Sequence, residues 1–137
     1  MTSPPRLATF SIDGTTKYGA VVDGGIVDLS ARFAKKYPTL REVVAAGALM
    51  RLAEDGARHR PDFALDAIIW QPPIPAPEKI ICIGVNYPDR NAEYKDGQDA
   101  PKYPSMFMRT PRSFVGHDTP LVRRARRRSS TMRASWC

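Results

Sequence analysis

The feature that most constrains this chain is a proline-rich segment near its middle, residues 71–77. Four of these seven residues are prolines, and each proline removes an amide donor and restricts the backbone φ angle. Such a segment cannot continue a helix or form a central strand, so it indicates a semi-rigid linker. We therefore expect an N-terminal lobe over residues 1–70, a linker over 71–78 and a second region from residue 79.

The residues before the linker predict a small α+β lobe. Short apolar runs separated by Asp-Gly and Gly-Gly pairs are typical of strands joined by tight turns. The stretches that follow have apolar residues three or four positions apart, as in a helix, and each lies near a residue that can cap a helix. The expected strands are residues 7–12, 18–22 and 26–28, and the expected helices run over about 28–36, 39–47 and 50–56, before an extended run at 64–70. We expect two or three strands and two or three helices here.

The region after the linker, residues 79–121, combines short apolar runs with polar turns. The run 80–83 is rich in β-branched residues and too short for a helix, so we interpret it as a buried strand; a second strand is expected at 105–108. Between them, Asn86 can cap a short helix that ends at Gly97. Polar groups at the ends of buried strands often form a small-molecule site. We place the candidate site in this region.

The order and spacing of residues in this region resemble the fumarylacetoacetate hydrolase family. Members typically read G-x-N-Y-x-x-H-x-x-E, then P-x-x-F-x-K, then S-x-x-G. No single motif is specific, but their agreement in order is. The residues that match are Gly84, Asn86, Tyr87, Glu93, Pro104, Phe107, Ser113 and Gly116. The resemblance covers residues 1 to about 122, loosely before Lys79.

The resemblance implies a fold, a class of reaction and a cofactor. It implies that residues 79–121 begin a mixed, β-rich catalytic domain that is truncated in this chain. Members act on 2-oxo or 2-hydroxy dicarboxylates from aromatic breakdown, as isomerases, decarboxylases or C–C hydrolases. In the complete parent enzyme, Mg²⁺ or Mn²⁺ held by carboxylates would stabilise an enolate. A homodimeric parent is also implied, because the family is often dimeric.

The resemblance also assigns roles to individual residues. Glu93 matches a catalytic glutamate on a mobile lid, which positions a water or moves a proton. Arg90 stands where the family has histidine; arginine cannot act as a base near neutral pH but can bind a carboxylate bidentately. This favours diacid substrates and an isomerase or decarboxylase. Arg109 matches a lysine that faces the substrate carboxylate. The other substrate-binding candidates are Asn86, Tyr87 and Ser113.

Several of these residues also have an ordinary structural interpretation. Arg90 and Glu93 are three residues apart on an expected helix, so they would form a surface ion pair. Arg109 would be a cation at a strand end, and Ser113 would supply a turn hydroxyl. The sequence alone leaves these alternatives open.

The tail, residues 122–137, differs in composition from the rest of the chain. It holds six arginines and no acid, whereas the remainder carries 15 basic and 14 acidic side chains. The family places a D-Y-E-x-E motif, with two metal-binding glutamates, soon after S-x-x-G, and this tail lacks it. A frame shifted back by one nucleotide lets the codons of 129–137 encode Gln-Leu-Asp-Tyr-Glu-Gly-Glu-Leu-Val. We therefore expect an out-of-frame, disordered tail and no metal bound by this chain.

Part of that translation is forced by the genetic code. In the shifted frame, Met132 followed by Arg133 permits only Glu or Ala, and Trp136 followed by Cys137 permits only Val. The other positions depend on codon choice. The coding DNA would therefore decide whether the tail is out of frame.

Two non-enzymatic functions are the alternatives. The arginine-rich tail could bind nucleic acid or an acidic partner, but it lacks interleaved aromatic residues and the body is nearly neutral. Only non-specific, salt-sensitive binding would follow. The other alternative is a small structural domain without catalysis.

Composition bears on location and on the remaining reactive residues. The N-terminus has no apolar signal-peptide core and no long apolar run occurs, so we expect a cytoplasmic protein without a membrane partner. Cys82 and Cys137 form no disulfide framework, and Cys82 is expected in the core. His59 and His117 are isolated, lack metal-ligand spacing and are expected to be solvated.

Overall fold

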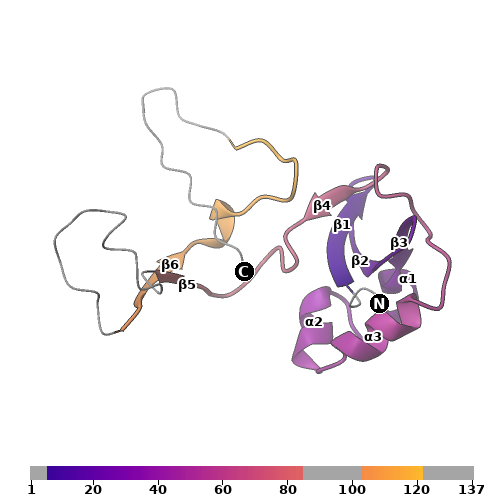
Figure 1. The fold of residues 1–137 in the computed structure, drawn as a ribbon, viewed down its shortest axis with the longest axis horizontal. Coiled ribbons are helices and arrows are strands. Elements are labelled where there is room, and N and C mark those ends of the chain that lie inside the picture. The colour runs from indigo at the N-terminus through magenta and orange to yellow at the C-terminus, as the bar shows by residue number, and fades with distance from the viewer. Residues whose placement is uncertain (1–5, 85–102, 122–137) are drawn as a thin grey trace. The chain divides into compact units, whose positions relative to one another are not determined.

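A computed structural model describes residues 6–84 and 103–121 of the 137-residue chain (Figure 1). The chain divides into two compact units. Among the described residues, the first unit comprises 6–76 and 114–121, and the second comprises 77–84 and 103–113.

The first unit is built on a four-stranded antiparallel sheet with the strand order β3-β2-β1-β4. Its strands are β1 (Arg6–Ile12), β2 (Thr15–Val22), β3 (Gly25–Asp28) and β4 (Ile69–Gln71). Asp13 and Gly14 join β1 to β2, and both have positive φ angles, 50° and 73°, as a two-residue hairpin turn requires. Most of the sheet therefore comes from consecutive hairpins, and only β4 returns from far along the chain.

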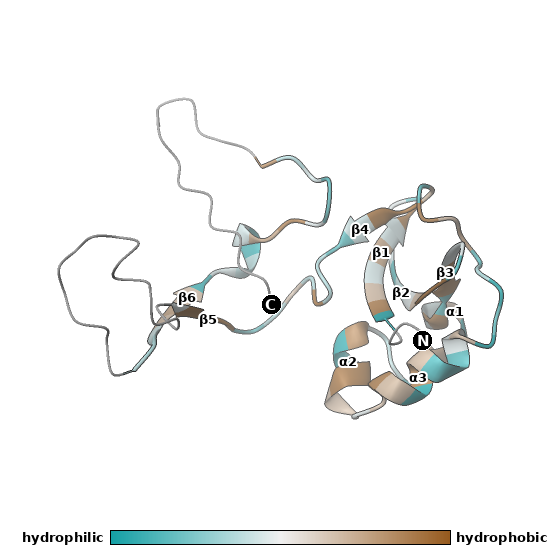
Figure 2. Ribbon diagram, in the orientation of Figure 1, coloured by the Kyte–Doolittle hydropathy of each residue, from teal (hydrophilic) through white to brown (hydrophobic). Residues whose placement is uncertain are grey.

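Three short helices lie on one side of this sheet (Figure 1). They are α1 (Leu29–Phe33), α2 (Leu40–Ala45) and α3 (Leu49–Gly56). Tyr18 and Val27 of the sheet pack with Leu29, Val43 and Leu52 of the helices in one buried cluster. Full burial of each such side chain stabilises the fold by about 1.5–3 kcal/mol. Much of the α2 helix is brown in Figure 2, the colour of hydrophobic residues.

A second apolar cluster occupies the opposite side of the sheet. Phe10, Ile26 and Ile68 are buried there, as expected from the alternation of side chains along a strand. Phe63 adds to it, and its ring lies edge-on to Phe10 with centroids 6.0 Å apart. The backbone of Phe63 also pairs with Ile26. This pairing needs glycine at position 25, because a Cβ there would lie 2.3 Å from the Phe63 carbonyl oxygen.

The second unit contains the antiparallel pair β5 (Ile80–Gly84) and β6 (Ser105–Arg109), followed by the 3-10 turn η1 (Pro111–Ser113). Cys82 is buried and opposite Phe107. Ile81 is 58% exposed and Ile83 is 52% exposed, on a strand whose apolar character is visible in Figure 2.

These elements confirm the α+β class and both strands expected after the linker. Three details of the prediction are wrong. The lobe has four strands rather than two or three, and the extended run over 64–70 narrows to β4, because residues 64–67 form a turn. The run 80–83 is not buried on both faces, because only one face of β5 is covered within the described residues. None of the helices in the described part of the chain is long and apolar enough to cross a membrane.

Candidate functional site

The structure describes two of the six candidate site residues. Arg109 ends β6 and Ser113 ends η1, so the two flank a single short turn in the second unit. The other four candidates, Asn86, Tyr87, Arg90 and Glu93, lie outside the described residues. How all six are arranged therefore stays a prediction.

Arg109 is exposed and lies beside an aromatic ring of its own strand. Its guanidinium carbon is 5.0 Å from the centroid of the Phe107 ring, and the two residues share a strand face because they are two apart. A cation over an aromatic face at an exposed site gains about 0.5–1 kcal/mol. The stacking orients the guanidinium, whose fork of N–H groups suits a carboxylate. This placement is compatible with both the binding role and the structural alternative.

Ser113 is exposed and its hydroxyl is used within the turn. Its Oγ donates to the Thr110 carbonyl oxygen at 2.7 Å, and its amide donates to the same oxygen at 3.0 Å. The structural interpretation of Ser113 as a turn hydroxyl is therefore confirmed. The hydroxyl oxygen can still accept a hydrogen bond, so the binding role stays a prediction.

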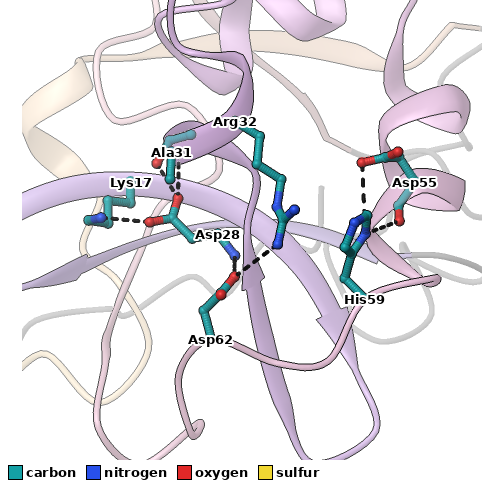
Figure 3. Close-up of polar contacts among 8 residues, drawn as sticks. Lys17, Asp28, Ala31, Arg32, Asp55, His59 and Asp62 are labelled. Carbon is teal, nitrogen blue, oxygen red and sulfur yellow. Dashed lines mark hydrogen bonds and ion pairs between the residues drawn. The ribbon is translucent and has the colours of Figure 1, made fainter.

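A network of charged side chains in the first unit was not anticipated from the sequence (Figure 3). Lys17 Nζ lies 2.6 Å from the Asp28 carboxylate. The backbone amide of Asp28 donates to Asp62 at 2.7 Å, and Arg32 lies 3.9 Å from the same Asp62 carboxylate. The network joins β2, β3, α1 and the segment before Phe63. Its groups are paired with one another, which indicates a structural role.

The two histidines and Cys82 have different surroundings. His59 Nδ1 lies 2.8 Å from the Asp55 carbonyl oxygen at the end of α3 (Figure 3). His117 Nε2 lies 3.3 Å from the exposed Asp118 carboxylate. The expectation that His59 is solvated is therefore only partly met, whereas Cys82 is buried as expected. Across residues 6–84 and 103–121, no three His, Cys, Asp or Glu side chains form a group that could hold a metal ion.

The first unit also contains a cavity of about 330 Å³. Its walls come from β1, β2, the start of α2 and the proline-rich segment. Several of its polar groups already have partners within the protein: Thr9 donates to the Pro73 carbonyl oxygen at 2.6 Å, and Thr39 and Glu42 bond each other. The other lining residues are both apolar and polar: Pro38, Leu40, Ile74, Pro75 and Ala76, and Thr16, Lys17, Tyr18 and Arg41.

Comparison with known proteins finds a similarity in the second region of the chain. Residues 79–133 match the fumarylacetoacetate (FAA) hydrolase C-terminal family. This region is similar to the fumarylacetoacetate hydrolase family. The match begins at Lys79, directly after the expected linker, and so confirms the resemblance read from the motifs.

One curated relative is a tautomerase. The chain is 39% identical over 56 residues to oxaloacetate tautomerase YisK of Bacillus subtilis (strain 168). These residues make up 40% of this chain and 19% of the tautomerase, so the similarity spans less than a fifth of that protein.

The family match extends past Leu121 into the arginine-rich tail. The tail itself, residues 122–137, lies outside the described residues. The out-of-frame origin of this segment stays a prediction.

Proposed function

We propose that this chain is part of a fumarylacetoacetate hydrolase-family enzyme that interconverts the keto and enol forms of a 2-oxo dicarboxylate. The observation that carries the proposal is the family match over residues 79–133, supported by the similarity to an oxaloacetate tautomerase. Oxaloacetate is itself a 2-oxo dicarboxylate, which agrees with the diacid preference inferred from Arg90.

The proposed substrate has two carboxylates, and the chain offers two arginines for them. Arg109, exposed at the end of β6, presents paired N–H donors that suit one carboxylate. We assign the second carboxylate to Arg90. Asn86 and Tyr87 would donate hydrogen bonds to the 2-oxo group, and Ser113 Oγ, which donates to Thr110, would accept one from the enol hydroxyl.

Tautomerisation needs one proton carrier, and we assign that role to Glu93. In the keto-to-enol direction, its carboxylate takes the proton from the carbon beside the 2-oxo group. The C–H electron pair becomes the C=C bond, the carbonyl electrons move to oxygen, and that oxygen then takes the proton from Glu93, which restores the carboxylate. No water has to be activated, so replacement of the family histidine by Arg90 impairs this reaction less than C–C hydrolysis.

Members of this family are often metal-dependent, but the described residues bring no ligand set together. We therefore assign no step to a metal in this chain. In the shifted reading frame, the two glutamates of Asp-Tyr-Glu-Gly-Glu would supply the oxygen ligands that Mg²⁺ and Mn²⁺ prefer. We propose that the chain as given, which lacks them, is inactive.

The test compares this 137-residue chain with the protein encoded when the frame of residues 122–137 is restored. Each is assayed for loss of the enol form of oxaloacetate by ultraviolet absorbance, with Mg²⁺ or Mn²⁺ and then with a chelator. We expect metal-dependent turnover from the restored protein and a rate lower by roughly a thousand-fold or more from this chain. The reason is that several kcal/mol of transition-state stabilisation are lost, and each ~1.4 kcal/mol changes the rate tenfold.

Three results would contradict the proposal. Comparable metal-dependent turnover by the 137-residue chain would show that its tail does not inactivate it. Coding DNA whose shifted frame lacks Asp-Tyr-Glu would remove the basis for restoration. Cleavage of acylpyruvates without tautomerisation would make the parent a C–C hydrolase, whereas turnover of 2-hydroxymuconate-type diacids would support a role in aromatic breakdown.

A further inference from the structure

Gly116, the last residue of the S-x-x-G motif, lies directly against the backbone of β4. A Cβ at position 116 would lie 1.8 Å from the Trp70 carbonyl oxygen, 2.7 Å from the carbonyl carbon and 3.1 Å from the Gln71 Cα. The shortest of these distances is about half a normal non-bonded separation. Because the obstructing atoms belong to the backbone, no side-chain rotation relieves the overlap, and only glycine fits.

This contact places the segment after the candidate site in the first unit. Residues 114–121 cluster with the lobe, whereas Arg109 and Ser113 belong to the second unit. The β4 strand is last in the sheet order and pairs with β1. A strand at the end of a sheet has one side without a strand partner, where another segment can attach. Gly116 is the residue that permits this close approach.

The segment makes a turn at the point of contact. The Gly116 carbonyl oxygen accepts a hydrogen bond from the Thr119 amide at 3.3 Å. Asp118, inside the turn, has a positive φ of 57°, a conformation that Asp adopts more readily than most residues. The turn and the close approach together define a local docking element, residues 116–119.

We propose that this element anchors the end of the site-bearing segment to the lobe. Ser113 precedes Gly116 by three residues, and three residues reach at most about 10 Å. A fixed Gly116 therefore limits the movement of Ser113 through the connecting chain. The restraint acts on Ser113 through the connecting chain, whatever reaction the candidate site performs.

The proposal is tested by nuclear magnetic resonance on the intact 137-residue chain, whose mass is 15.3 kDa. The unmodified chain should show a nuclear Overhauser effect between the Hα protons of Gly116 and Gln71. In Gly116→Ala, this contact should be lost and the amide resonances of Trp70 and Gln71 should move. Amide exchange at Ser113 should become faster, since the turn that protects it loses its anchor.

Gly84→Ala is the matched control, because it makes the same chemical change in the second unit. A Cβ at position 84 would meet only side-chain atoms of Ser105 and Phe107, at 3.0–3.7 Å, so the Trp70 and Gln71 resonances should stay in place. Unchanged β1 and β2 resonances in both variants would show that the lobe remains folded. The proposal is overturned if the unmodified chain lacks the Gly116–Gln71 effect, or if Gly116→Ala leaves Ser113 exchange unchanged.

Discussion

Asp28 connects several elements of the lobe. Its buried carboxylate accepts hydrogen bonds from Lys17, Ser30 and the Ala31 amide, while its own amide donates to Asp62. Burial by itself would raise the pKa of this carboxyl, but the hydrogen bonds from Lys17, Ser30 and Ala31 lower it below its ordinary value. Asp28 therefore remains ionised in the folded lobe.

The lowered pKa makes lobe stability depend on pH in the acid range. A carboxyl whose folded-state pKa lies below its unfolded value, about 3.9, contributes its full stabilisation above that value. The contribution is lost as the pH falls through the folded-state pKa. We expect Asp28→Asn to destabilise the lobe at pH 7 by about 1–3 kcal/mol, the cost of leaving a buried polar group without its partner.

Urea unfolding at pH 7 and at about pH 3 measures this effect. The difference between the unmodified chain and Asp28→Asn should shrink at the lower pH, because the unfolded chain binds a proton at this carboxyl more readily than the folded chain does. Asp23→Asn, at an exposed turn, is the matched control and should change little. An equal loss at both pH values would mean that the Asp28 charge contributes nothing.

The α2 helix shows how a very short element is stabilised. It has six residues, whereas isolated helices shorter than about 12–15 residues are marginal in water. Thr39 caps it by accepting from the Arg41 amide, and Glu42 accepts from the Thr39 amide, which completes a capping box. Leu40 and Val43 are buried against the sheet. Capping and packing therefore both support α2.

Removing the cap should weaken α2 without disturbing its packing. We expect Thr39→Ala to lower the free energy of unfolding of the lobe by about 1 kcal/mol, measured by urea denaturation. Thr39→Ser keeps the hydroxyl acceptor and should retain most of the stability. If the serine variant loses as much as the alanine variant, the methyl group of Thr39 and not its hydroxyl is responsible.

At the scale of the whole molecule, the two units differ in how completely they bury apolar surface. The lobe has a buried cluster on each face of its sheet. The β5–β6 pair instead leaves Ile81, Ile83, Met106 and Met108 more than half exposed on one face. A two-stranded pair is at best marginally stable alone in water, and a contiguous apolar surface favours association.

We expect the double variant Ile83→Ser with Met106→Ser to bind less of an apolar fluorescent dye and to self-associate less. The two residues are opposite each other in the register. The unfolding midpoint of the lobe should not change, because neither buried cluster contains these residues. Val44→Ser removes an exposed apolar side chain from the lobe and is the control for a general loss of hydrophobicity. Unchanged dye binding in the double variant would show that this face is covered in solution.

Local sequence determined where the elements of the lobe begin and turn. The Asp13-Gly14 turn, the start of α2 at Thr39 and the strands after the linker were all predicted. These signals act through φ angles and hydrogen bonds within a few residues, so they can be read without a fold. The family of the second region was likewise recognisable, because its motifs keep their order along the chain.

Only the tertiary structure decided which distant groups meet. The amide of Asp28 finds Asp62, 34 residues later, and Gly116 finds the backbone of Trp70. Nothing near either residue in the sequence indicates its partner. Such contacts depend on how strands and turns are brought together when apolar surface is buried, and no local pattern encodes that arrangement.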